Sequence, residues 1–113
     1  MVEVNVETKD KYCLIRIDGE VDASSSIHID EAMQQAVDAN CKSILVDCKE
    51  LHYISSAGLG VFMSYIQVVE TKNIQLVLFN MSPKVYKVFE ILGLHQLLTI
   101  VDTEETAKKD FVQ

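Results

Sequence analysis

The sequence predicts an α/β protein with a mixed sheet, formed as one domain from residues 1–113. Short apolar runs typical of buried strands alternate along the chain with segments whose apolar residues recur at helical spacing. Strands that alternate with helices pair in parallel, whereas the first two strands are close enough in sequence to form a hairpin. At 113 residues the chain suits one domain. We therefore expect about five strands and about four helices, in the order ββαβαβαβα.

The N-terminal residues predict an antiparallel hairpin. Residues 2–6 alternate between valine and polar residues, which is the period of a strand with one buried face. A polar turn at residues 8–11 separates them from a second, apolar strand at residues 12–17. Residues 18–20, Asp-Gly-Glu, are expected to end this second strand.

Three further strands are predicted from short apolar runs at residues 43–47, 74–79 and 97–101. Such runs are typical of strands that are covered on both faces. The segments between them predict helices with apolar residues at i, i+3, i+4 and i+7. In the first helix the predicted buried residues are Ile29, Ala32, Met33, Ala36 and Val37. In the second they are Leu59, Phe62, Met63, Ile66 and Val69.

Capping residues predict where the helices begin and end. The serines at residues 24–26 are candidate N-caps for the first helix. Ser82 with Pro83 marks the start of the third helix, and Gly93 marks its end. Thr103 is a candidate cap for a terminal helix that contains Ala107 and Phe111. The predicted buried residues of the third helix are Val85, Val88, Phe89 and Leu92.

Composition and charge exclude several classes of partner. The formal net charge is −7, and the basic residues are scattered, which disfavours binding to a nucleic-acid backbone. No apolar run approaches the roughly 20 residues needed to cross a bilayer. Residues 1–4 are acidic and alternating instead of basic and then apolar, so no signal peptide is expected. We therefore expect a cytoplasmic protein that binds neither nucleic acid nor membranes.

The three cysteines, Cys13, Cys41 and Cys48, are odd in number, widely spaced and without a C-x-x-C pair. This pattern argues against a disulfide framework and against a zinc site. It predicts small buried apolar side chains in a reducing compartment. The three histidines likewise lack the spacing of metal ligands. We expect neither a metal nor another cofactor.

Sequence motifs of enzymes are missing. The run Gly58-Leu59-Gly60 lacks the third glycine of a dinucleotide-binding loop, and no Lys-Ser or Lys-Thr follows it as in a phosphate-binding loop. Ser56 lacks the preceding glycine of a nucleophile elbow. Carboxylates are numerous enough for a paired acid site, but such residues are equally common at turns. They include Asp10, Asp18, Asp22, Asp47 and Glu50. We expect the protein not to be an enzyme.

The segment Ser55-Ser56-Ala57-Gly58-Leu59-Gly60 is unusual, because each glycine in a helix is less favourable than alanine by about 1 kcal/mol. Two interpretations remain open from the residues alone. In the first, a serine caps the helix and the glycines permit tight packing of the helix on the sheet. In the second, an exposed serine at an anion-tolerant helix N-terminus accepts a phosphate, beside glycines that let a partner approach closely.

Three segments resemble motifs of the bacterial anti-sigma-factor antagonists, which are STAS domains. Residues 54–61, ISSAGLGV, resemble the family's phosphorylation motif, D-S-[ST]-G-L-G. Residues 19–22, GEVD, resemble its G-E-[LIV]-D motif. Residues 81–94, MSPKVYKVFEILGL, resemble its S-P-x-V-x-[RK]-[LV]-[FL]-x-x-x-G-L stretch. The three matches follow the family's order and together span most of the chain.

The resemblance implies a STAS fold whose partner is an anti-sigma factor with serine kinase activity. In such a switch the unphosphorylated antagonist binds the kinase and frees the kinase's target. Phosphorylation of the motif serine, here Ser56, releases the antagonist, and a serine phosphatase resets it. The implied partner-binding residues are Asp22, Ser55, Ser56, Ala57, Gly58, Leu59 and Gly60.

The sequence departs from the family motif at two positions. Ser55 stands where the family has aspartate, and Ala57 stands where it has a second serine or threonine. The first departure leaves Ser55 open as an alternative acceptor, whereas the second removes a competing acceptor and favours Ser56. Two other functions remain open. One is a STAS scaffold subunit of another regulatory or lipid-transport complex, never phosphorylated, and the other is a nucleotide-binding or weakly hydrolytic role.

Overall fold

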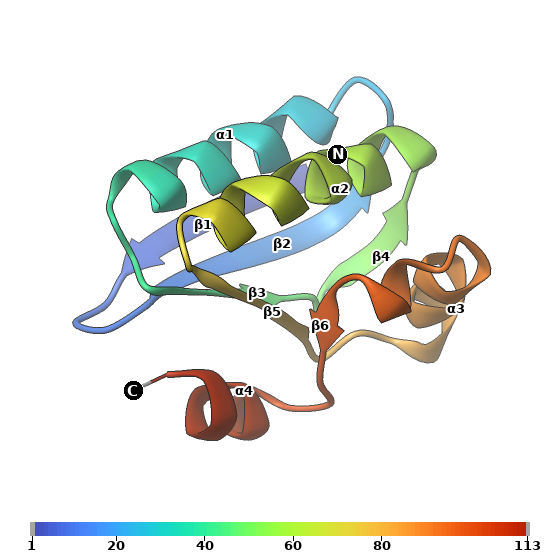
Figure 1. Cartoon of the computed structure of the whole chain (residues 1–113). Coiled ribbons are helices and arrows are strands. Elements are labelled where there is room, and N and C mark those ends of the chain that lie inside the picture. Colours follow the sequence, from blue (N-terminus) through green and yellow to red (C-terminus); the bar gives the residue numbers. More distant parts are fainter. Residues whose placement is uncertain (1, 113) are drawn as a thin grey trace.

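The alternating valines near the N-terminus form the predicted hairpin. In the computed structural model, which describes residues 2–112, β1 (Val2–Thr8) pairs antiparallel with β2 (Cys13–Val21) (Figure 1). Residues 1 and 113 of the predicted domain lie outside the described residues. The hairpin forms one edge of a six-stranded mixed sheet, so the predicted fold class is confirmed.

The other strands run parallel to β2. They are β3 (Ser43–Asp47), β5 (Gln75–Phe79) and β6 (Thr99–Ile100), and the sheet order is β1-β2-β3-β5-β6. β3 and β5 are buried on both faces along most of their length, which explains their nearly continuous apolar sequences. β6 is shorter than the predicted strand at residues 97–101, because residues 97 and 98 form the turn after the short helix η1 (Leu94–Gln96) and only Thr99 and Ile100 pair with β5.

β4 (Leu51–Ile54) is a sixth strand that the sequence did not predict. It pairs in parallel with the last part of β2, up to the pair Val21 and Ile54. The prediction that residues 18–20 end the second strand is wrong, since β2 continues to Val21. Gly19 permits this continuation: its φ is +120°, which a side chain would disfavour, and the register shifts directly after it. The carboxyl ends of β2 and β4 therefore lie side by side.

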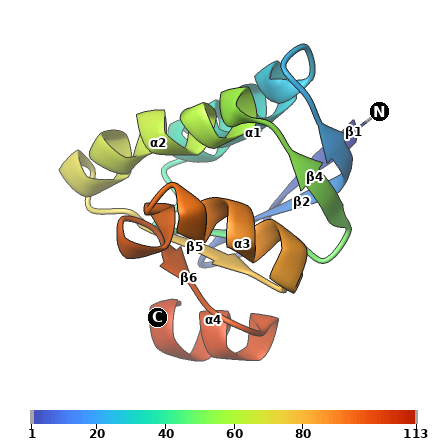
Figure 2. The same ribbon diagram turned by 90° about the vertical axis from the view of Figure 1, so that its right-hand side faces the viewer.

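Helices cover both faces of the sheet (Figures 1 and 2). α1 (Ser26–Asp38), α2 (Ser56–Thr71) and α3 (Pro83–Ile91) contribute their buried residues to the larger core cluster. α4 (Glu104–Phe111) lies on the opposite face and closes a second, smaller cluster. The buried members of this second cluster are Leu14, Leu45, Val77, Phe79 and Ala107.

Capping side chains set most helix boundaries as predicted. Ser82 caps α3 by accepting a hydrogen bond from the Val85 N–H at 3.2 Å, with Pro83 at the first helical position. Gly93 follows the end of α3 with a left-handed φ of +74°. Thr103 caps α4, because its Oγ1 accepts a hydrogen bond from the Thr106 N–H at 3.1 Å. These boundaries depend on local chemistry, which the sequence carries directly.

Two residues that were predicted to be buried are exposed. Met63 of α2 is 49% exposed and Leu92 after α3 is 55% exposed. Tyr65 takes the buried position in α2 instead, and its hydroxyl donates to the backbone carbonyl of Asp30 in α1 at 3.2 Å. The five residues predicted to be buried in α1 are all buried.

The expectation of three unpaired cysteines is also wrong. Cys13, the first residue of β2, and Cys41, just before β3, form a disulfide with their Cα atoms 5.9 Å apart. Cys48 is free and buried. The pairing of β2 with β3, in which Cys13 lies opposite Ile44, creates this proximity. A spacing rule that considers only neighbours in sequence does not detect it.

Candidate partner-binding surface

The motif serines lie where β4 passes into α2, at one edge of the sheet (Figure 1). The Ser55 N–H donates to the Val21 carbonyl of β2 at 2.8 Å, which ties this junction to the strand that precedes Asp22. Because β2 and β4 are parallel, both chains leave the sheet at the same edge. The fold thus brings together two segments that the sequence analysis singled out, residues 19–22 and 54–61.

Ser55 and Ser56 have different roles. Ser55 occupies the N-cap of α2 in an extended conformation, and its Oγ accepts a hydrogen bond from the Gly58 N–H at 3.3 Å. Ser56 is the first residue of the helix, and it is exposed. Capping and exposure were alternative interpretations of this segment, and in the structure Ser55 forms the cap while Ser56 is exposed.

The two glycines of the motif also differ. A Cβ atom on Gly58 would lie 2.7 Å from Ile54 Cγ1 and 2.9 Å from Val21 Cγ1, so only glycine lets α2 approach the sheet this closely. A Cβ atom on Gly60 would meet nothing within 4 Å. Gly58 therefore serves packing, whereas Gly60 leaves an open position on the surface.

Ser56, Gly60 and Met63 are spaced i, i+4 and i+7 on α2 and therefore lie on one side of the helix. All three are exposed, and Ala57 beside them is exposed as well. We call these four residues the α2 surface. Met63 is a member that the sequence analysis missed, because its apolar side chain fitted the buried stripe. Its spacing from Ser56 was the signal that could have identified it.

The predicted binding residues do not all reach the surface. Ser55 is half-buried, and Gly58 and Leu59 are buried, with Leu59 only 2% exposed. Leu59 packs in the larger core cluster, so it supports the α2 surface from beneath and presents no side chain to a partner. The predicted residues that are exposed are Asp22, Ser56, Ala57 and Gly60.

Asp22 holds the loop between β2 and α1 in shape. Its Oδ1 accepts hydrogen bonds from the Ser25 Oγ at 2.8 Å, the Ser25 N–H at 2.9 Å and the Ser24 Oγ at 2.9 Å. These bonds, above all those from Ser25, lower the pKa of Asp22 to about 2. Ser25 occupies the N-cap position of α1, but its side chain bonds Asp22 and makes no capping bond to the helix. The prediction of a serine at the N-cap of α1 is therefore confirmed in position, although the Ser25 hydroxyl makes no capping hydrogen bond.

The N-terminus of α2 is electrostatically suited to an anion. The helix has 16 residues and no acidic side chain in its first turn. Its N–H groups and the positive end of its dipole stabilise negative charge there. A phosphate on Ser56 would lie at this end, and it would add about −1.5 to −2 charges to an exposed position.

The other candidate groups have structural roles or stay apart. Asp47 Oδ1 accepts hydrogen bonds from the Lys49 N–H at 3.0 Å and from Asn80 Nδ2 at 3.3 Å. Among residues 2–112, no three His, Cys, Asp or Glu side chains gather as a metal site would require. Within the same residues, no helix combines the length and the apolar character needed to cross a membrane.

The mixed sheet with its four described helices has the fold of a known family. The STAS domain family matches residues 3–107, and the chain belongs to this family. Two bacterial relatives carry more specific names. The anti-sigma-B factor antagonist of Listeria monocytogenes is 28% identical over 106 residues, which cover 91% of this chain and 93% of that protein. The anti-sigma F factor antagonist of Paenibacillus polymyxa is 26% identical over 110 residues, covering 94% and 92%.

Solved structures agree with this assignment. The anti-sigma factor antagonist SpoIIAA in its unphosphorylated form superposes with a TM-score of 0.78 at 24% identity, covering 95% of both chains. The Bacillus cell fate determinant SpoIIAA in the phosphorylated form superposes with a TM-score of 0.73 at 25% identity, covering 95% of this chain and 97% of that one. The predicted resemblance to anti-sigma-factor antagonists is thereby confirmed.

Proposed function

We propose that this protein is an anti-sigma-factor antagonist that is switched off by phosphorylation of Ser56. The unphosphorylated form binds an anti-sigma factor with serine kinase activity and releases that factor's target, and a serine phosphatase restores this form. The protein acts in the cytoplasm as a binding partner and not as an enzyme. The exposure of Ser56 at the start of α2, while Ser55 forms the cap, is the observation that carries the proposal.

The α2 surface explains how a phosphate could prevent binding. A partner that covers Gly60 and Met63 would also cover Ser56, because the three residues lie on one side of the helix. The unphosphorylated hydroxyl loses little on burial, whereas a doubly charged phosphate would have to give up its hydration. The helix N-terminus meanwhile tolerates the phosphate, so the fold survives the modification.

Asp22 is proposed to contribute to the same contact. It is exposed, and it follows the strand that is hydrogen-bonded to the Ser55 junction. Its low pKa keeps it charged, and its bonds to the serines hold it in one position. A fixed negative charge beside the α2 surface favours a partner with a basic residue at the corresponding position.

The proposal is tested by incubating the protein with serine kinases of its own genome and ATP, followed by mapping of phosphate by mass spectrometry. We expect a single phosphorylation site at Ser56, which disappears in Ser56→Ala. Ser56→Asp is expected to keep its fold and to bind the kinase at least about tenfold more weakly, since even part of a phosphate's charge disfavours burial. Circular dichroism reports the fold and calorimetry reports the affinity.

Thr71→Asp is the matched control, because Thr71 is also an exposed residue of α2 with a hydroxyl group but lies 15 residues, about 22 Å, along the helix from Ser56. It adds the same charge to the same helix and is expected to bind nearly as well as wild type. Equal affinity of Ser56→Asp and wild type would contradict the switch. Absence of phosphate at Ser56 with every kinase would favour a STAS scaffold subunit, and phosphate at Ser55 would move the acceptor by one residue.

A further inference from the structure

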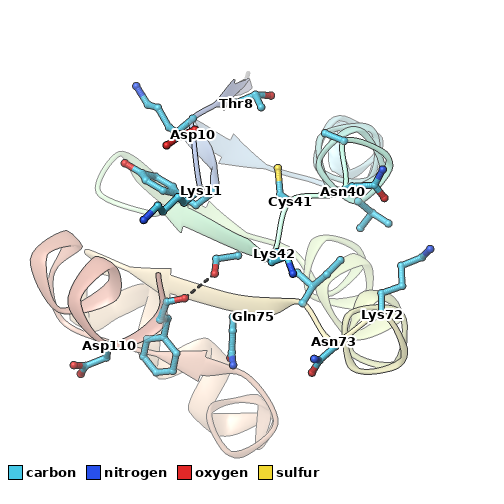
Figure 3. A pocket seen from close by; sticks show the side chains of 17 residues that line it. Thr8, Asp10, Lys11, Asn40, Cys41, Lys42, Lys72, Asn73, Gln75 and Asp110 are labelled. Carbon is cyan, nitrogen blue, oxygen red and sulfur yellow. Dashed lines mark hydrogen bonds between the residues drawn. The ribbon is translucent and has the colours of Figure 1, made fainter. Parts of the chain in front are cut away.

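A groove lies at the end of α2 that is remote from Ser56. It has a volume of about 920 Å³ and lies between the turn of residues 8–12, the α1–β3 connection at residues 39–43 and the α2–β5 connection at residues 72–75 (Figure 3). Phe111 at the end of α4 completes its lining. The proposed switch uses none of these residues.

Cys41 lines this groove, and its disulfide partner Cys13 lies behind it. Cys41 is 9% exposed, whereas Cys13 is completely buried. Their Cα atoms are 5.9 Å apart, inside the range of roughly 4.4–6.8 Å that a disulfide requires. The pairing of β2 with β3 sets this separation, since Cys13 lies opposite Ile44 in the register. The fold therefore holds the two sulfur atoms within bonding reach even when they are reduced.

The charges around the groove favour a reactive thiol at Cys41. Positive charge stabilises the thiolate, which is the nucleophile in thiol–disulfide exchange. Lys42 follows Cys41 directly in the chain, and among residues 2–112 it forms no ion pair within 4 Å. The lysines that line the groove are Lys9, Lys11, Lys42 and Lys72, and the carboxylates are Asp10 and Asp110. Lys9 is paired with Glu7 at 3.0 Å, which leaves Lys11, Lys42 and Lys72 against two carboxylates in this groove of an acidic protein.

Cys48 lies in the opposite kind of environment. It is completely buried, and burial raises the pKa of its thiol well above the ordinary value. A protonated and inaccessible thiol cannot attack an external disulfide, and Cys48, unlike Cys13, has no bonded cysteine partner to attack from within the fold. Cys48 therefore provides an internal control within the same chain.

We propose that Cys13 and Cys41 are a reversible redox site, which low-molecular-weight disulfides oxidise through the groove. The Cys41 thiolate attacks one sulfur of the small disulfide, which forms a mixed disulfide and expels one small thiolate. The Cys13 thiolate then attacks the Cys41 sulfur and expels the second small thiolate. In sum, two protein thiols lose two electrons and two protons, and one small disulfide becomes two small thiols.

The redox state is expected to change stability but not partner binding. The disulfide connects positions 28 residues apart in the sequence and restricts the unfolded chain. It lies at the far end of α2 from Ser56, so the α2 surface is the same in both states. In the cytoplasm, where disulfides are usually transient, we expect the site to be reduced at rest and oxidised under oxidative conditions.

The experiment uses the full chain, first reduced with dithiothreitol and then incubated with oxidised glutathione. By mass spectrometry we expect the oxidised chain to be lighter than the reduced chain by about 2 Da, because two hydrogens leave on bond formation. A single peptide pair that joins Cys13 to Cys41 is expected. The oxidised form should melt roughly 10 °C above the reduced form.

Three variants separate the roles of the cysteines. Cys13→Ala is expected to stop at the mixed disulfide on Cys41, and Cys41→Ala to react with glutathione at least roughly tenfold more slowly than Cys13→Ala. Cys48→Ala should form the bond as fast as wild type. A folded wild-type protein that retains three free thiols after oxidation, or melts equally in both states, would overturn the proposal. Neither result bears on phosphorylation of Ser56, which is measured separately.

Discussion

At the scale of single residues, the candidate site depends on which of two adjacent serines forms the N-cap hydrogen bond of α2. Ser55 accepts the Gly58 N–H and is partly buried, whereas Ser56 has no capping task and faces outward. The family's aspartate would be as good an N-cap as serine, since both side chains accept hydrogen bonds from the first turn. Replacement of that aspartate by Ser55 therefore preserves the capping function and removes one negative charge beside Ser56.

Asp22 gives a prediction that belongs to this scale. Its hydrogen bonds from Ser25 and Ser24 lower its pKa from the ordinary 3.8 to about 2. Because the folded pKa is the lower one, the contribution of Asp22 to stability is complete above pH 3.8 and is lost as the pH falls towards 2. In an NMR titration of the side-chain carboxyl carbons, we expect the midpoint of Asp22 at about 2.

Two serine variants control this titration. Ser25→Ala removes a hydrogen-bond donor and is expected to raise the midpoint towards 3.8. Ser26→Ala should leave it unchanged, because the Ser26 hydroxyl donates to the Ala23 carbonyl and not to Asp22. A midpoint near 3.8 in the wild-type protein would mean that the hydrogen bonds of this loop do not persist in solution.

At the scale of elements, the close approach of α2 to the sheet positions the site. Gly58 touches Ile54 of β4 and Val21 of β2, which are the last residues of the two strands that lead to the loop and the helix. Gly60, one turn nearer the helix centre than Ser56, faces open space. Gly58 therefore lies on the side of α2 that packs against the sheet, whereas Gly60 lies on the exposed side.

This difference predicts opposite effects of one substitution. Gly58→Ala is expected to destabilise the protein by about 1–3 kcal/mol, because the new methyl group overlaps Ile54 and Val21. Gly60→Ala is expected to stabilise the protein by up to about 1 kcal/mol, because alanine favours the helix and meets no neighbour. Urea denaturation measures both changes.

Gly60→Ala has a second use. If the kinase approaches α2 closely at this position, the stabilised variant will bind it more weakly than wild type, although its fold is intact. Weakened binding with increased stability separates a surface role from a structural one. Unchanged affinity would show that the partner does not contact Gly60.

At the scale of the whole molecule, the sheet separates two cores of unequal size. α1, α2 and α3 close the larger core, and α4 alone closes the smaller one (Figure 2). α4 is anchored at its end, where the Phe111 carbonyl accepts a hydrogen bond from Ser43 Oγ at 2.6 Å. The smaller core therefore depends on a short helix near the end of the described chain.

We predict that Ala107→Asp is one of the most damaging single substitutions on α4. Ala107 is completely buried among apolar residues, so its replacement leaves an unpaired carboxylate without a hydrogen-bond partner. We expect a loss of about 3 kcal/mol or more, measured by urea denaturation. Glu105→Ala, on the exposed side of the same helix, should change stability by no more than about 0.5 kcal/mol. Equal effects of the two substitutions would contradict the role of α4 as a cover.

Elements whose signals lie within a few residues were predicted well. The valine alternation, the apolar runs and the caps at Ser82 and Thr103 each reflect a local preference of the backbone. β4 was missed because it has four residues and only its two ends are buried, a pattern without a clear period. The exposure of Met63 was missed because helical spacing alone does not show whether another element will cover an apolar side chain.

The sequence by itself determined the fold class, the order of the four helices and of every strand of the described chain except β4, and the segment that holds the candidate site, because local periodicity and capping encode them. Only the tertiary structure decided which serine caps α2 and which is exposed, and only it separated Gly58 from Gly60. The same is true of the pairing of β2 with β4 and of Cys13 with Cys41. Each of these depends on contacts between segments far apart in the chain, and no local pattern encodes such contacts.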